Sequence, residues 1–177
     1  MILTPQQIMK WFVHRTEVFA TQQKSGAYFP TKRPITLEDI KKHLKGEITI
    51  GVYCLKTDNT VKWACIDIDG DETNLKELKK EAIIIYDLFS DFNRMLEFSG
   101  RKGYHIWVFF KQAIQAKFAQ QLVKSRLNRV GLNRHEVFPK QTELNEGRKY
   151  GNLVKLPLAK HKVSGKWSEI LKCEGIK

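Results

Sequence analysis

The sequence predicts one mixed α/β domain spanning residues 1–177. Amphipathic helix patterns alternate with short apolar runs typical of strands, and some of these runs are joined by tight turns as hairpins, which excludes a purely parallel sheet. With 177 residues, of which 42% are hydrophobic, the chain is long enough to bury a core. No repeat or linker-like change in composition divides it, so a single domain is expected.

Two helices are expected in the first 46 residues. Thr4 followed by Pro5 is an N-cap with proline at the first helical position, and apolar residues at helical spacing predict a helix that runs to about residue 20. Thr36 caps a second, short helix that ends at Gly46.

The middle of the chain contains both kinds of pattern. Residues 48–55 and 61–69 predict a hairpin joined by the turn sequence TDNT. Residues 72–90 carry apolar residues at helical spacing and predict an amphipathic helix. Two strand-like runs, 94–99 and 104–110, follow on either side of the sequence GRKG.

The last third returns to a helix and then to strands. Residues 113–130 have a helical pattern, and the runs 135–139 and 152–158 are strand-like. Residues 162–171 predict a terminal hairpin with Ser164 and Gly165 at its tip. The longest apolar runs are too short to span a membrane, and the amino terminus lacks the layout of a signal peptide, so a cytoplasmic protein is expected.

The charge is distributed unevenly along the chain. Residues 1–98 hold 14 Lys or Arg and 14 Asp or Glu, whereas residues 99–177 hold 17 and 5, so the whole net charge of +12 arises in the second half. Clustered cations gain affinity for nucleic acids by releasing condensed counterions. The asymmetry favours nucleic acid or nucleotide phosphates as partners on one face of the domain, against a merely soluble basic surface.

Two acids interrupt the buried strand pattern WACIDIDG. Asp67 and Asp69 are two residues apart, so on a strand both project from the same face and repel each other unless a cation or strong donors lie between them. Paired carboxylate oxygens suit hard divalent cations, with Mg²⁺ or Mn²⁺ as natural occupants. A salt-bridged structural pair is the alternative.

A glycine-flanked basic turn, SGRKGYH, connects two strand-like runs. Arg101 and Lys102 lie between two glycines, His105 begins the next strand, and Ser99 precedes the turn. Such a turn brings cations and backbone amides to a phosphate. The alternative is an exposed basic tip and a histidine whose hydrogen bonds are satisfied within the core.

A third feature is Glu136, an acid in an apolar strand and the best candidate for a further carboxylate ligand. An isolated glutamate is more often an exposed edge residue.

Together these three stretches resemble the archaeo-eukaryotic primase superfamily. CIDID looks like its first, acidic motif, SGRKGYH like its second motif, and EVF like its third. The resemblance covers residues 36–161 and is closest to the small primase-polymerases of CRISPR-associated and mobile-element conflict systems, with the phrases HLKGEITIGVYCL and EVFPKQ as further counterparts. Many relatives have aspartate where Glu136 stands, and this chain has no zinc module.

The resemblance implies an RRM-like antiparallel catalytic sheet with packed helices, joined to a smaller amino-terminal α/β unit. It implies a template-dependent nucleotidyltransferase, a DNA primase-polymerase that is also expected to start primers. Asp67, Asp69 and Glu136 would hold two Mg²⁺ or Mn²⁺ ions, with His105 as a fourth catalytic residue. The residues that would contact the nucleotide are Ser99, Arg101, Lys102, Gly103, His105, Lys140, Lys155, Lys160 and His161.

The expected partners are a single-stranded DNA template with its primer and nucleoside triphosphates, without a membrane. CRISPR adaptation proteins or other mobile-element proteins are further partners that the resemblance implies. Two rival functions follow from the same residues. A two-metal nuclease uses the same carboxylates, and a non-catalytic RRM-like module binds single strands without needing three acids on its working face.

Overall fold

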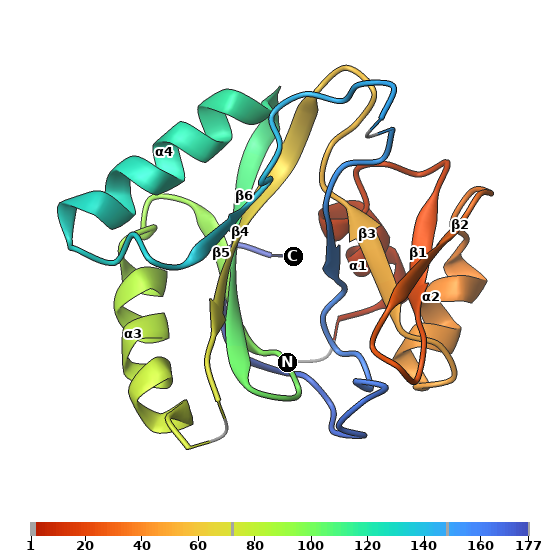
Figure 1. Ribbon diagram of the computed structural model, residues 1–177, viewed down its shortest axis with the longest axis horizontal. Coiled ribbons are helices and arrows are strands. Elements are labelled where there is room, and N and C mark those ends of the chain that lie inside the picture. Colours follow the sequence, from red (N-terminus) through yellow and green to blue (C-terminus); the bar gives the residue numbers. More distant parts are fainter. Residues whose placement is uncertain (1–2, 72, 148, 177) are drawn as a thin grey trace.

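A computed structural model describes residues 3–71, 73–147 and 149–176 as a mixed α/β fold with two antiparallel sheets (Figure 1). The helices are α1 (Pro5–Phe12), α2 (Leu37–Leu44), α3 (Leu75–Asp87) and α4 (Ala116–Arg129). The smaller sheet has the order β2-β1-β3-β8 and consists of β1 (Phe19–Gln22), β2 (Tyr28–Thr31), β3 (Ile50–Tyr53) and β8 (Leu153–Lys155). The larger sheet has the order β7-β4-β6-β5-β9 and consists of β4 (Thr60–Asp69), β5 (Asn93–Phe98), β6 (Gly103–Gln115), β7 (Glu136–Phe138) and β9 (Glu169–Glu174).

The elements form layers. Helices α3 and α4 cover one face of the larger sheet, and the smaller sheet lies on its other side together with α1 and α2 (Figure 1). The predicted combination of an antiparallel sheet with packed helices and a smaller amino-terminal α/β unit is confirmed. Strand β8, from the carboxyl-terminal third, completes the smaller sheet by pairing with β3.

Alternating residues of β4 serve the two faces of the larger sheet. Ile66 and Ile68 are buried in the cluster that α3 and α4 cover. Trp63 and Cys65 point the other way, into the core between the two sheets, where the ring of Trp63 packs against Trp107 at 4.8 Å. Since side chains alternate along a strand, Asp67 and Asp69 continue the inner face beyond the apolar core. Near this end of β4, the space between the sheets is lined by polar groups.

The first helix is shorter than the sequence predicts. The prediction of a helix to about residue 20 is wrong, because α1 ends at Phe12 and residues 19–22 form β1. The indole Nε1 of Trp63 donates a hydrogen bond of 2.8 Å to the carbonyl oxygen of Phe12, which satisfies an acceptor left open by the end of the helix. Pairing of β1 with both β2 and β3 outweighs the local helical pattern.

The hairpin predicted for residues 48–55 and 61–69 is also wrong. The turn itself forms, with Lys56 donating to the carbonyl of Thr60 and with Asn59 at a φ of 60°. Beyond the turn the two strands separate, because β3 pairs with β1 and β8 whereas β4 pairs with β6 and β7. The same chain reversal therefore carries the backbone from one sheet to the other.

The remaining predicted elements are found with small shifts in their bounds. The helices expected over 72–90 and 113–130 correspond to α3 and α4, and α2 begins after Thr36 in a capping box with Asp39. The terminal hairpin forms only in part. Residues 160 and 167 make a single bridge around the turn, and β9 then pairs with β5. Among the described residues, no helix is long and apolar enough to cross a membrane.

Candidate active site

The three predicted carboxylates gather where β4 meets β7. Asp67 and Asp69 end β4, and Glu136 begins β7 directly opposite Asp67 in the antiparallel register. Residues opposite each other in such a pair project from the same face of the sheet. The Asp67 side chain is 23% exposed, whereas those of Asp69 and Glu136 are more than half exposed. Asp67 thus forms the inner part of an acidic group at the end of the strand.

Lysines pair with the two outer acids. The Lys102 Nζ lies 2.9 Å from Asp69 Oδ2, and the Lys140 Nζ lies 2.5 Å from Glu136 Oε2. Over the part of the chain that the structure describes, no three His, Cys, Asp or Glu side chains are arranged to hold a metal ion. The backbone register nevertheless places three carboxylates on one face, and both lysines are more than a third exposed. The donor set fits hard divalent cations, which would take the place of the lysines.

Asp67 is electrostatically unfavourable in its ionised form. Burial raises the pKa of this carboxyl, and the negative charges of Asp69 and Glu136 raise it further, while His105 and Lys140 act in the opposite direction. A carboxylate that is held among other acids in this way gains from a bound cation.

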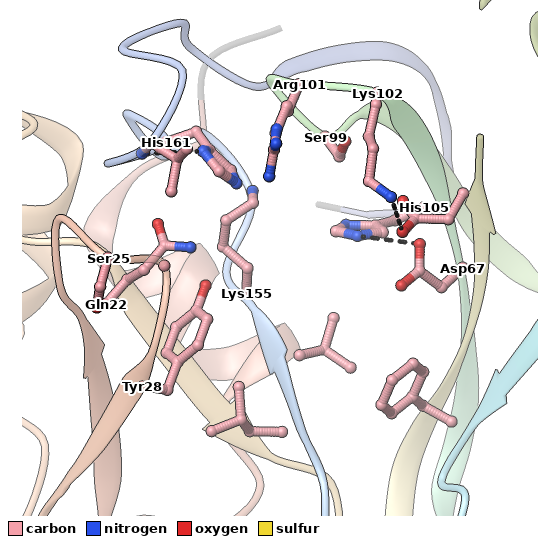
Figure 2. Close-up of a pocket in the computed structure, with 16 residues that line it drawn as sticks. Gln22, Ser25, Tyr28, Asp67, Ser99, Arg101, Lys102, His105, Lys155 and His161 are labelled. Carbon is pink, nitrogen blue, oxygen red and sulfur yellow. Dashed lines mark hydrogen bonds and ion pairs between the residues drawn. The ribbon is translucent and has the colours of Figure 1, made fainter. Parts of the chain in front are cut away.

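His105 lies beside Asp67 on the neighbouring strand. It is the register partner of Asp67 on β6, and its Nε2 is 3.7 Å from Asp67 Oδ1 (Figure 2). The other ring nitrogen, Nδ1, lies 3.4 Å from Glu97 Oε1. Burial opposes a positive charge on the imidazole, but Glu97 and then Asp67 outweigh it and raise the pKa of His105. The ring therefore lies between two carboxylates with one edge toward Asp67.

Glu97 is a fully buried acid that was not predicted as a site residue. Its Oε1 lies 3.2 Å from the Lys155 Nζ, and its Oε2 accepts a hydrogen bond of 3.0 Å from the Trp107 Nε1. Burial alone would raise the pKa of this carboxyl, but Lys155 and His105 lower it to about 2. Since Glu97 belongs to β5 and Lys155 to β8, the ion pair joins the two sheets.

A cavity of about 480 Å³ opens between the two sheets at this point. Figure 2 shows Asp67, His105 and Lys102 on one side of it, with Lys155 and Tyr28 facing them. The predicted site residues that line the cavity are Asp67, Asp69, Ser99, Arg101, Lys102, His105, Lys155 and His161. The others, Gly103, Glu136, Lys140 and Lys160, are not among its lining residues.

The basic turn between β5 and β6 forms the upper rim in Figure 2. The backbone geometry of the turn requires both of its glycines. Gly100 has a φ of 87°, and a Cβ at Gly103 would lie 2.2 Å from the carbonyl oxygen of Ile68. Gly103 therefore permits close pairing with β4 and does not itself line the cavity. Arg101 is exposed and Lys102 half-buried at this rim.

A second turn, residues 161–166, meets the basic turn across the top of the cavity. The Ser164 hydroxyl donates a hydrogen bond of 2.7 Å to the carbonyl oxygen of Gly100. The Nδ1 of His161 accepts from the backbone amide of Ser164 at 3.3 Å, so its other nitrogen is left for the cavity. Burial lowers the pKa of His161, as do the nearby charges of Lys155 and Arg101. The cavity is thus bordered by the two cations of the basic turn, by Lys155 of β8 and by the imidazole of His161.

The smaller sheet supplies a wall that sequence reasoning missed. Gln22, Ser25 and Tyr28 line the cavity opposite the carboxylates (Figure 2). They come from β1, β2 and the turn between them. No pattern in the sequence marks them, because their position depends on how the two sheets pack.

Comparison with known proteins identifies the family. Residues 5–174 match the family described as "TOTE conflict system, Archaeo-Eukaryotic Primase domain". The chain belongs to this family. The predicted membership of the archaeo-eukaryotic primase superfamily is thereby confirmed, and it supports a primase-like nucleotidyltransferase activity. No curated protein matches the sequence.

Two solved structures share the primase fold. The chain is similar to the archaeo-eukaryotic primase domain of the primase-polymerase of cyanophage S-2L, with a TM-score of 0.56 and 12% identity over 90% of this chain and 82% of that one. It is also similar to the polymerase domain of Ligase D from Mycobacterium tuberculosis, which was solved in complex with DNA. There the TM-score is 0.50, with 13% identity over 93% of this chain and 70% of that one.

Proposed function

We propose that this primase-family chain is a template-dependent nucleotidyltransferase, a DNA primase-polymerase. It joins nucleoside triphosphates to a 3′-hydroxyl on a single-stranded DNA template and starts primers. One observation carries the proposal: Asp67 and Asp69 share a cavity of about 480 Å³ with Arg101, Lys102 and Lys155. A site that joins carboxylates to several cations suits a triphosphate and the metal ions that accompany it.

Two Mg²⁺ or Mn²⁺ ions would be held by Asp67, Asp69 and Glu136. When bound, such ions activate the attacking hydroxyl and neutralise charge on the triphosphate. The three acids come from the adjoining ends of β4 and β7, with Asp67 as the shared inner member. Lys102 and Lys140, which pair with the outer acids, are then released to contact phosphate oxygens.

The remaining residues bind and orient the nucleotide. Arg101 presents a guanidinium fork to phosphate oxygens from an exposed turn, and the Ser99 hydroxyl lies at the base of that turn. Glu97 and Asp67 raise the pKa of His105 despite its burial, and in its protonated form the ring presents Nε2–H next to Asp67, where it can donate a hydrogen bond to the phosphate being attacked. His161 closes the opposite rim. The cavity thus excludes part of the bulk water and holds the triphosphate against the acids.

A primer-extension assay tests the proposal. The parent protein, given a labelled primer on a single-stranded DNA template, Mn²⁺ or Mg²⁺ and either nucleotide set, should lengthen the primer, and an unprimed template tests initiation. Asp67→Asn or Asp69→Asn should reduce synthesis by about a hundredfold or more because a metal ligand is lost. Asp71→Asn is the matched control, since Asp71 is an exposed acid of the same segment whose carboxylate accepts hydrogen bonds from Thr73 in its own turn.

Thermal melting supplies a second readout. Asp67→Asn should not lower the melting temperature in chelator, because the ionised acid is already disfavoured by burial and by its neighbours. Added Mn²⁺ should raise the melting temperature of the parent and of Asp71→Asn but not that of Asp67→Asn. Synthesis by Asp67→Asn at the parental rate would contradict the metal-site assignment.

The two rival functions make different forecasts. A two-metal nuclease would cut labelled DNA in Mn²⁺ without nucleotides. We expect no cleavage, because the basic turn that leads to His105 favours the binding of a triphosphate. A binding module would retain single strands without extending a primer. A link to CRISPR adaptation proteins stays a prediction from the sequence.

A further inference from the structure

Glu97 is the most deeply buried charged group next to the candidate active site. It has no exposed surface, although it lies on β5 at the edge of the cavity region. Burying a carboxylate is costly unless it is paired and hydrogen-bonded. Met95, two residues earlier on the same face of the strand, is apolar and buried in the core between the sheets, so Glu97 is an acid that continues an otherwise apolar face.

All the polar contacts of Glu97 converge on the site. One oxygen accepts from Trp107, and the other lies 3.2 Å from Lys155 and 3.4 Å from His105 Nδ1. Trp107 is two residues from His105 on β6 and on the same face, and Lys155 approaches from the smaller sheet. Three groups from two strands thus hold one carboxylate in a single orientation.

The position of Glu97 fixes the direction of the imidazole. His105 Nδ1 is buried and has no hydrogen-bond partner among the described residues, and the acid beside it is Glu97, whose Oε1 lies 3.4 Å away. Because the two ring nitrogens point in roughly opposite directions, an Nδ1–H facing Glu97 turns Nε2 toward Asp67 and the cavity. Among the described residues, Glu97 is the acid beside this end of the ring, so without its carboxylate no other acid there would hold the ring in that rotation.

We propose that Glu97 is a positioning residue, which holds His105 Nδ1–H so that Nε2 faces the incoming triphosphate, and that Lys155 keeps Glu97 in place across the two sheets. The proposal rests on the proposed function, since it names how one of the cavity's phosphate-facing groups is oriented. It also gives Lys155 a role different from the direct nucleotide contact that the sequence predicts. The Nζ of Lys155 is held by Glu97 and by the carbonyl oxygen of Leu156 at 3.4 Å.

The first measurement is spectroscopic and needs no activity. In protein labelled with ¹⁵N-histidine, the His105 signal is assigned by its absence from His105→Ala. The parent should show a protonated Nδ1. Glu97→Gln should change the nitrogen shifts of His105, because one amide cannot accept from both Trp107 and His105 as the two carboxylate oxygens do. An unchanged His105 signal in Glu97→Gln would overturn the proposal.

The second measurement is a double-mutant cycle on nucleotide use. Glu97→Gln should lower kcat/KM for the nucleotide by about tenfold to a hundredfold through misplacement of the imidazole. If Glu97 acts through His105, adding Glu97→Gln to His105→Ala should cost less than about threefold more. Losses that multiply would show that Glu97 acts independently of His105 and would overturn the proposal.

A matched control and a second variant address folding. Glu174→Gln also removes a carboxylate paired with a buried cation, Arg94 of β5, but away from the cavity. It should leave both the His105 signal and kcat/KM unchanged. Should Glu97→Gln fail to fold, Glu97→Gln with Lys155→Met removes both buried charges together, so that no unpaired charge remains inside. The same change in the His105 signal is then expected, and a parental signal there again overturns the proposal.

The two proposals fail in different ways. A parent that extends no primer but shows the Glu97-dependent His105 signal would contradict the proposed function and leave the orientation role supported. A parent that extends primers while Glu97→Gln shows a parental signal and parental kcat/KM would support the proposed function and overturn the role of Glu97.

Discussion

The four acids in and beside this site differ in their exposure and in the residues that lie next to them. Asp67 is mostly buried beside a histidine, Asp69 and Glu136 are exposed beside lysines, and Glu97 is sealed between a lysine and a histidine. The sequence assigns Asp67, Asp69 and Glu136 to one site. It could not assign Glu97, because the run RMLEFS reads as an ordinary strand and the lysine that pairs with Glu97 is 58 residues away.

Arg101 provides a test at the residue scale. Its exposed guanidinium lines the cavity, and no carboxylate pairs with it among the described residues. Arg101→Ala should raise the nucleotide KM about tenfold, since a charge-assisted bond to phosphate contributes about 1.5–3 kcal/mol and 1.4 kcal/mol is a factor of ten. Steady-state kinetics with Arg129→Ala, an exposed arginine on α4, as control would check this. Equal effects of both substitutions would remove Arg101 from the site.

At the scale of elements, local sequence signals determine where a helix begins, whereas long-range contacts determine which strands pair. Capping residues Thr4 and Thr36 mark both amino-terminal helices correctly, because a cap is a contact between near neighbours. The partner of each strand is a long-range property. Residues 48–55 alternate like a hairpin partner of 61–69, but β3 is held by β8, about one hundred residues away in sequence. This is why the acidic strand was predicted correctly and its neighbours in the sheet were not.

The start of α2 gives a second prediction. Asp39 accepts hydrogen bonds from the amide and hydroxyl of Thr36 and a bidentate pair from Arg33. Asp39→Asn should therefore lower the free energy of unfolding by about 1–2 kcal/mol at neutral pH. Glu38→Gln is the matched control, because Glu38 is exposed and its pair with Lys41 is long, at 3.5 Å.

The stabilisation that Asp39 provides should also depend on pH. The Arg33 guanidinium, aided by Thr36, holds the pKa of Asp39 well below its usual range despite partial burial. The unfolded chain then binds the proton more tightly, so the stabilisation is present above the ordinary carboxyl pKa and is lost as the pH falls through the acid range. Denaturant unfolding should show a difference between the parent and Asp39→Asn at pH 7 that shrinks below about pH 4. A constant difference would mean that the charge of Asp39 is not what stabilises the helix start.

At the scale of the whole molecule, the basic half of the chain does not form one face. Helix α4 covers the outer face of the larger sheet (Figure 1). It carries exposed cations such as Lys124. Lys160 directly precedes the turn 161–166, and it is exposed next to His161 at the cavity rim. The expectation of a single basic face is therefore wrong, and only part of the charge excess borders the candidate site.

This division allows a test of where the template lies. Lys160→Glu and Lys124→Glu change the net charge equally, from exposed positions on opposite sides of the larger sheet. If the template passes the cavity rim, Lys160→Glu should weaken single-strand binding about tenfold at low salt and reduce the slope of log affinity against log salt by about 0.7, the value for one phosphate contact on a single strand. Lys124→Glu should have little effect, and so should Lys79→Glu on α3.

Lys155 is unsuitable for charge reversal, because it pairs with Glu97 in the interior and a glutamate there would bury two acids together. Fluorescence anisotropy of labelled single-stranded DNA over a range of salt concentrations measures both quantities. Equal losses for the three surface variants would indicate general cationic attraction and exclude a dedicated template path at the rim.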